Sequence, residues 1–137
     1  MNISRLMEFL HDELGKKLRG VAYTEGDGVE IEYIRRDIRE EFSQEELDKL
    51  VEAYTEGEYS RKHLEKVHKI DEAEYLILKA VDSFTVVIFP NTDTTIYIAF
   101  DTDVDIMSSH FVNECLSHLG MGDGVLEKKA ETGEHPG

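Results

Sequence analysis

Residues 74–100 read EYLILKAVDSFTVVIFPNTDTTIYIAF, and this stretch decides the fold class. It holds three runs of β-branched and aromatic residues, which are typical of strands, and the breaks between them are Asp82-Ser83 and Pro90-Asn91-Thr92-Asp93. Connections this short cannot carry crossovers, so the pattern predicts an antiparallel meander. The run at 84–89 is apolar on both faces, so we expect it in the centre of the sheet.

Two more strands are expected upstream, at residues 18–24 and 29–35. A Gly-rich turn, Glu25-Gly26-Asp27-Gly28, separates them, as in a β-hairpin. In the second run Val29, Ile31 and Tyr33 alternate with glutamates, so one face of that strand should be exposed to water.

Helices are expected on both sides of these strands. Apolar residues recur at helical spacing over residues 3–14 and 104–119. Between the strand groups, Ser43-Gln44-Glu45-Glu46 is a capping box that starts a helix reaching to about Gly57, and Ser60 can cap a short helical piece.

The predicted fold class is therefore α+β. Its elements run α-β-β-α-β-β-β-α, and a five-stranded antiparallel sheet with helices on one or both faces would bury the apolar stripes. We expect one domain over residues 1–120. Residues 121–137 turn to Gly, Glu, Lys and Pro, which predicts a flexible, disordered tail.

Composition excludes several classes of protein. The 137 residues include 15 basic and 30 acidic side chains, for a net charge of −15, which argues against nucleic-acid partners. No apolar run approaches the roughly 20 residues of a membrane helix, and the first residues are no secretory signal. We therefore expect no membrane partner and a cytoplasmic location, which the single cysteine fits.

The charge is unevenly spread. Residues 21–58 carry a net charge of −9 and residues 71–120 a net charge of −8, whereas residues 59–70 carry +3. Two interpretations of this basic stretch remain open: its cations pair with acidic neighbours, or they form a contact surface for an acidic protein partner. In the second case the partner-binding residues would be Arg61, Lys62, Lys66 and Lys69.

Three carboxylates alternate at Asp101, Asp103 and Asp105, as at the start of a calcium loop. An EF-hand next needs Gly at its sixth position and Glu at its twelfth, but these positions hold Ile106 and Val112. Helix N-capping and weak cation binding by the three carboxylates remain as alternatives.

Motifs for catalysis are missing from the sequence. His110, Glu114 and His118 follow one line of the last expected helix, but we interpret them as surface residues, and Cys115 as a core residue. No Gly-x-Ser-x-Gly, HExxH or CxxC motif occurs. We expect no enzymatic activity and no cofactor.

Several segments carry a resemblance to a family. Residues 18–23 after the opening helix, Ile34-Arg35-Arg36-Asp37-Ile38, the helix start Phe42-Ser43-x-x-Glu46 and the closing residues 111–116 resemble a group of small, acidic, uncharacterised haloarchaeal proteins. That resemblance implies a salt-adapted archaeal protein and no assigned activity. The element order is also similar to that of roadblock and longin domains, of roadblock/profilin-like architecture, which are dimerising adaptor and regulatory modules.

These observations lead to one leading function and one alternative. We expect a non-enzymatic protein-interaction or regulatory module that forms a homodimer through free sheet edges. The alternative is a sensor domain that binds a small ligand or a cation.

Overall fold

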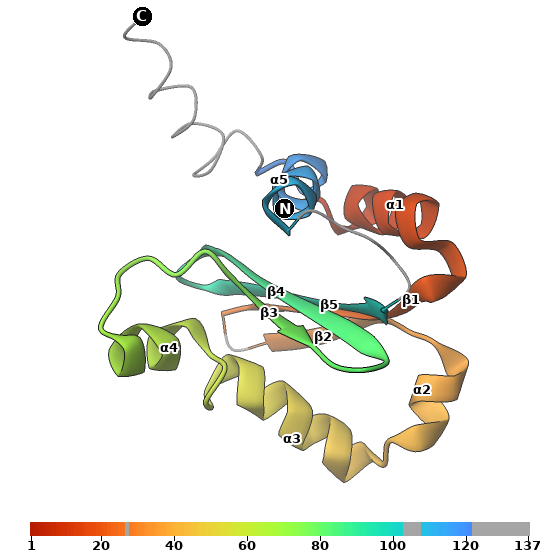
Figure 1. Ribbon diagram of the computed structural model, residues 1–137, viewed down its shortest axis with the longest axis horizontal. Coiled ribbons are helices and arrows are strands. Elements are labelled where there is room, and N and C mark those ends of the chain that lie inside the picture. The colour runs from red at the N-terminus through yellow and green to blue at the C-terminus, as the bar shows by residue number, and fades with distance from the viewer. Residues whose placement is uncertain (27, 103–107, 122–137) are drawn as a thin grey trace, which may run out of the picture. The chain divides into compact units, whose positions relative to one another are not determined.

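The computed structural model describes residues 1–26, 28–102 and 108–121 (Figure 1). The chain divides into two compact units, residues 18–102 and residues 1–17 together with 103–137. The larger unit contains the sheet, and the smaller contains the first and last helices. Among the described residues, no helix combines the length and the apolar character needed to cross a membrane.

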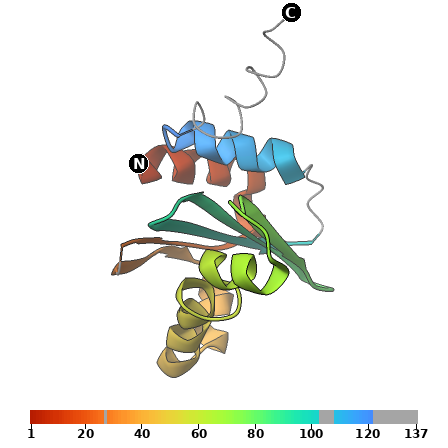
Figure 2. The same cartoon turned by 90° about the vertical axis from the view of Figure 1, so that its left-hand side faces the viewer.

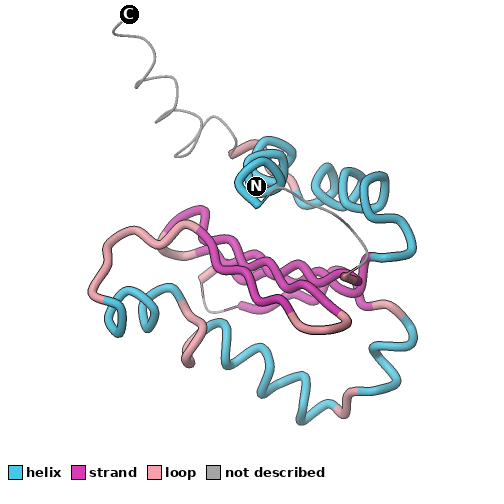
Figure 3. Tube along the Cα trace, in the orientation of Figure 1, coloured by secondary structure: helices cyan, strands magenta, loops and turns pink. Residues whose placement is uncertain are grey.

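The five strands form one antiparallel sheet in the order β2-β1-β5-β4-β3 (Figures 1 and 3). Their bounds are β1 Leu18–Glu25, β2 Gly28–Ile34, β3 Tyr75–Lys79, β4 Ser83–Asn91 and β5 Thr94–Asp101. The fold class, the hairpin and the meander are confirmed. Strand β4 is interior, as its two apolar faces predict, but the middle position belongs to β5, because the β1–β2 hairpin pairs with β5 on its other side.

Three helices follow β2 and lie on one face of the sheet: α2 Arg36–Glu41, α3 Gln44–Thr55 and α4 Arg61–His68 (Figure 2). The capping box of α3 is present, with Glu46 N–H donating to Ser43 Oγ over 3.1 Å and Ser43 N–H donating to Glu46 Oε1 over 2.9 Å. Ser60 caps α4 through a single hydrogen bond, its Oγ accepting from the backbone N–H of His63.

Helix α2 is absent from the sequence-based expectation. It spans only six residues, buries only Ile38 and has no side-chain cap. It therefore lacks the two signals that identify a helix start, a capping side chain and apolar residues at helical spacing. Phe42 returns the chain to an extended conformation before the next helix begins.

Helix α3 is fixed to the sheet by an aromatic cluster. The ring of Tyr54 lies 5.2 Å from that of Tyr59 and 5.0 Å edge-on from that of Tyr97, and it packs on Val87 and Phe89 of β4. Burial raises the pKa of the Tyr54 hydroxyl. The C-terminal end of α3 is thus held close to the sheet.

In the smaller unit, α1 Ile3–Leu14 and α5 Ser108–His118 pack against each other, and a short 3-10 helix, η1 Gly15–Lys17, follows α1. Phe9 stacks on His118 with ring centroids 4.4 Å apart and contacts Phe111 at 6.2 Å. Gly15, at φ 52°, ends α1 in a conformation that favours glycine. The expected helix start at residues 104–107 and the expected tail beyond Met121 lie outside the described residues.

Candidate functional site

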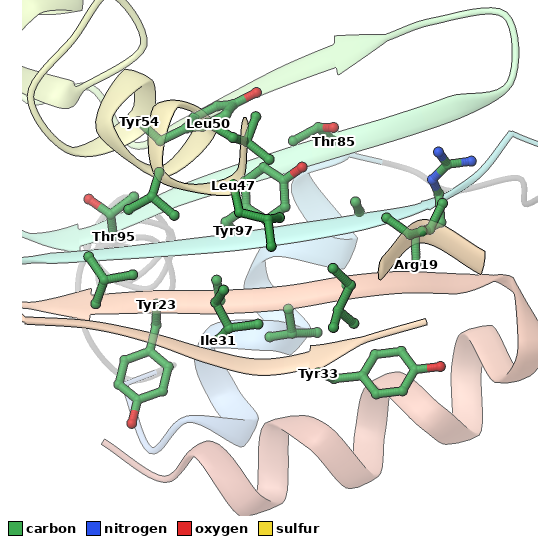
Figure 4. Close-up of a pocket in the computed structure, with 18 of the residues that line it drawn as sticks. Arg19, Tyr23, Ile31, Tyr33, Leu47, Leu50, Tyr54, Thr85, Thr95 and Tyr97 are labelled. Atoms are coloured by element: carbon green, nitrogen blue, oxygen red, sulfur yellow. The ribbon is translucent and has the colours of Figure 1, made fainter. Parts of the chain in front are cut away.

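A cleft of about 220 Å³ lies between the sheet and helices α2 and α3 (Figure 4). Its floor is formed by small side chains of neighbouring strands, including Ala22 on β1 and Ala99 on β5. Its opposite wall carries apolar side chains of α3, among them Leu47, Leu50 and Val51. The site is therefore a mainly apolar space over a floor of short side chains.

The register of the sheet explains why this space exists. Gly20 pairs with Ala99 and Thr24 pairs with Thr95, so short side chains gather on one face of β1 and β5 on either side of the Ala22–Tyr97 pair. Because α3 packs on the Tyr54 cluster through its later residues, from Leu50 onward, the start of the helix stands over these short residues. The gap between helix and strands stays unfilled there.

Strand β2 forms one rim of the cleft. Val29 and Ile31 line it and remain 39% and 43% exposed, which leaves apolar surface open to water at the sheet edge. The rings of Tyr23 and Tyr33 point to the opposite side of the sheet (Figure 4). Tyr23 and Tyr33 nevertheless belong to the lining, so this rim combines aliphatic and phenolic residues.

Polar groups gather at the other end of the cleft. Tyr97 hydrogen-bonds to Thr85, and burial raises the pKa of its hydroxyl while the neighbouring Arg19 charge lowers it. Figure 4 shows the Arg19 guanidinium on the same side of the sheet as Tyr97 and Leu47. Among the described residues that line the cleft, Arg19 is the only charged one.

Arg19 belongs to a small ionic cluster next to the cleft. Its Nη1 lies 3.4 Å from Asp101 Oδ1, whereas Arg35 donates to both oxygens of Asp101, over 2.9 and 3.2 Å. Arg35 also donates to both oxygens of Asp37, over 2.6 and 3.1 Å. The hydrogen bonds that Asp101 accepts, those from Arg35 above all, hold the pKa of its carboxyl below the usual value.

This arrangement suits binding. An apolar ligand body would be enclosed by aliphatic and aromatic side chains, and the hydroxyl and guanidinium groups at one end would orient it. Such a combination of apolar walls with a few convergent polar groups is typical of small-molecule sites.

The residues of the basic stretch lie on α4, away from this cleft. Lys62, Lys66 and Lys69 are exposed; the spacing of four residues puts Lys62 and Lys66 on one side of the helix, and Lys69 is its C-cap. Arg61 differs from these lysines because it is already paired: its Nε donates to Glu65 Oε2 over 3.0 Å, and its side chain is only 21% exposed. Glu65 also accepts from the backbone N–H of Ala73, a hydrogen bond that lowers the pKa of its carboxyl.

For the proposed cation site, Asp103 and Asp105 lie outside the described residues, and the carboxylate of Asp101 is engaged by Arg35. Within the described ranges, no three His, Cys, Asp or Glu side chains are grouped to hold a metal ion. His110 pairs with Glu114, and His118 stacks on Phe9. Cys115 is buried, as expected, and burial raises the pKa of its thiol.

The cleft was not predicted from the sequence. Its signal is the run of short residues at every second position of β1, namely Gly20, Ala22 and Thr24. Only the pairing of this strand with β5 and the position of α3 turn those short residues into the floor of a cleft.

Fold and site together define an α+β protein with a five-stranded antiparallel sheet and an apolar cleft under one helix. The chain belongs to the family described as Domain of unknown function (DUF7522), whose model matches residues 4–120. No curated protein sequence matches the chain.

Proposed function

We propose that this protein is a non-enzymatic regulatory module that binds a small, mainly apolar ligand in the cleft between α3 and the sheet. The observation that carries the proposal is the cleft itself, an apolar space with polar groups at one end. Its volume of about 220 Å³ exceeds the roughly 150 Å³ of an engineered cavity that binds benzene. The ligand is accordingly small.

Octanol is a suitable neutral probe for this proposal. Thermal unfolding of the full chain should shift to higher temperature as octanol is added, because a ligand that binds only the folded state stabilises it. Ala99→Leu places a larger side chain on the cleft floor and should abolish the shift. Ala22→Leu, on the neighbouring strand, repeats the test if Ala99→Leu impairs folding.

The matched control is Ala80→Leu, the same chemical change at an exposed position in the turn between β3 and β4. This variant should respond to octanol as the wild type does. An equal shift in the cleft variants, shown by circular dichroism to be folded, would mean that octanol binds elsewhere and would remove the proposal.

A second candidate function is protein interaction through α4. Lys62, Lys66 and Lys69 form no ion pair with any described residue, and two apolar side chains near them, Val67 and Ile70, are 58% and 48% exposed. Cations beside exposed apolar surface suit an acidic amphipathic partner segment. Replacing the three lysines by glutamine should release such a partner in co-purification, whereas the same change at Lys16 and Lys17 should not.

The acidic composition supports a salt-rich archaeal cytoplasm as the working environment. With a net charge of −15, the chain repels itself at low salt, and molar salt screens this repulsion within about 3 Å. Unfolding temperature should therefore rise with potassium chloride. The strand order also supports a roadblock-like homodimer, a module that would pair through a free sheet edge.

A further inference from the structure

We infer that the ligand of the α3 cleft is a small apolar monocarboxylate whose carboxylate is bound by Arg19. This inference rests on the proposed function, because it assumes that the cleft is a ligand site, and it adds the chemical class of the ligand.

The charge of the lining selects an anion. Arg19 is the only charged residue among the described residues that line the cleft, and every other lining side chain is apolar or a hydroxyl. A guanidinium binds a carboxylate through two parallel N–H donors, and such charge-assisted bonds are strong. A ligand cation would find no opposite charge among these lining residues.

Arg19 has donors to spare for this role. Its guanidinium makes one hydrogen bond with another described residue, the 3.4 Å contact from Nη1 to Asp101 Oδ1, and a guanidinium carries five N–H donors. Its side chain is 19% exposed, so it is accessible but partly shielded from water. Partial burial makes a charge pair formed there stronger than one on the surface.

Arg19 can turn to a ligand without leaving Asp101 unpaired. Arg35 already donates to both carboxylate oxygens of Asp101, over 2.9 and 3.2 Å. The usual cost of breaking a partly buried ion pair, an uncompensated charge, is therefore avoided. Arg35 itself is held by Asp37 and Asp101, so it is not available for the ligand in the same way.

The remaining groups fix how the ligand lies. The side chains of Tyr97 and Thr85 hydrogen-bond each other, and both residues line the cleft with Arg19, so in this binding mode their hydroxyls would also hydrogen-bond the ligand carboxylate. The hydrocarbon part would then extend between Ala22 and Ala99 on one side and Leu47 and Leu50 on the other. The acidic side chains of β2, Glu30 and Glu32, are exposed and do not line the cleft, so they do not repel the head group at contact distance.

Octanoate, octanol and octylamine share a chain length and differ in the charge of the head group, so they test the inference directly. Each is titrated into the wild-type full chain by calorimetry at fixed pH and salt. Octanoate should bind at least tenfold more tightly than octanol, the effect expected of one charge-assisted hydrogen bond, and octylamine should bind most weakly.

Two variants assign the effect to Arg19. Arg19→Gln should reduce octanoate affinity about tenfold or more and leave octanol affinity within about twofold. Arg36→Gln is the matched control, because Arg36 is 93% exposed on α2 and lies outside the lining. It should change neither affinity.

Each other outcome has a distinct meaning. Equal binding of octanoate and octanol would overturn the monocarboxylate inference and leave the cleft as a ligand site. A preference for octanoate that survives Arg19→Gln would overturn Arg19 as the anchor. If none of the three probes binds, the proposed function fails, and the inference fails with it.

Discussion

Arg35 donates two hydrogen bonds to Asp101, 66 residues further along the chain, over 2.9 Å to Oδ2 and 3.2 Å to Oδ1. The contact joins the residue between β2 and α2 to the last residue of β5. The contact therefore ties these two segments together at the end of the sheet where Arg19 lines the cleft.

Asp101→Asn should lower the free energy of unfolding at neutral pH by about 2 kcal/mol, since hydrogen bonds to charged groups contribute on that order. The effect depends on pH with a definite sign. Because the pKa of Asp101 is lowered in the folded state, its stabilisation is fully present above the unfolded value of about 3.9. It is lost as the pH falls through the lowered folded-state pKa.

Urea unfolding across pH checks this directly. Wild type and Asp101→Asn should differ by a constant amount above about pH 5 and converge in acid. Asp37→Asn is the control, because the Asp37 side chain is 57% exposed and its loss should cost less. A difference between wild type and Asp101→Asn that grows towards low pH would contradict the prediction.

Ser43→Ala should destabilise the protein by about 1 kcal/mol, because it removes the oxygen that accepts from the Glu46 N–H at the start of α3. Since α3 forms a wall of the cleft, hydrogen exchange of its first turn should also accelerate. Ser117→Ala, on the exposed surface of α5, is the control and should leave both quantities unchanged. Unaltered exchange in α3 would show that the cap is not needed to hold the helix.

Cys115 should resist thiol reagents in the folded protein. Its side chain is fully buried, and burial raises the pKa of its thiol, so little of the reactive thiolate forms. A colorimetric disulfide reagent should react with one thiol per chain in denaturant and with almost none without it. Rapid reaction under native conditions would contradict the burial of this helix face.

Self-association should occur through β3 rather than β2, the two edge strands. A two-fold axis normal to the sheet can place Ile77 opposite Ile77 of a second copy, with Tyr75 opposite Lys79. Pairing through β2 would instead gather Glu30 and Glu32 of both copies on one face.

The corresponding measurement is molar mass by light scattering at molar salt. The wild type should be a dimer, Ile77→Asp should be a monomer, and Ile31→Asp on the other edge should remain a dimer. Circular dichroism confirms that each variant is folded. A monomeric wild type at high protein concentration would refute self-association.

Much of the fold could be predicted because its signals are local. The capping box at Ser43, the Gly-rich turn after Glu25 and the short breaks within residues 74–100 each depend on a few neighbouring residues. Helix α2 was missed because its six residues carry neither a capping side chain nor an apolar stripe.

The cleft could not be predicted for a different reason. It arises from Ala22 and Ala99, 77 positions apart in sequence, which meet only through the pairing of β1 with β5. The availability of Arg19 for a ligand likewise depends on a distant contact, the hydrogen bonds from Arg35 to Asp101. In contrast, the cap that Ser60 provides for α4 could be predicted from neighbouring residues alone.

Whether the α3 cleft binds a ligand can be measured by intermolecular nuclear Overhauser effects between octanol and the isotope-labelled chain. If octanol binds there, its chain should give contacts to the methyl groups of Leu47, Leu50 and Ala99, which line the cleft. Contacts confined to the exposed apolar residues Val67 and Ile70 of the α4 region, or no contacts at all, would contradict the proposed ligand site.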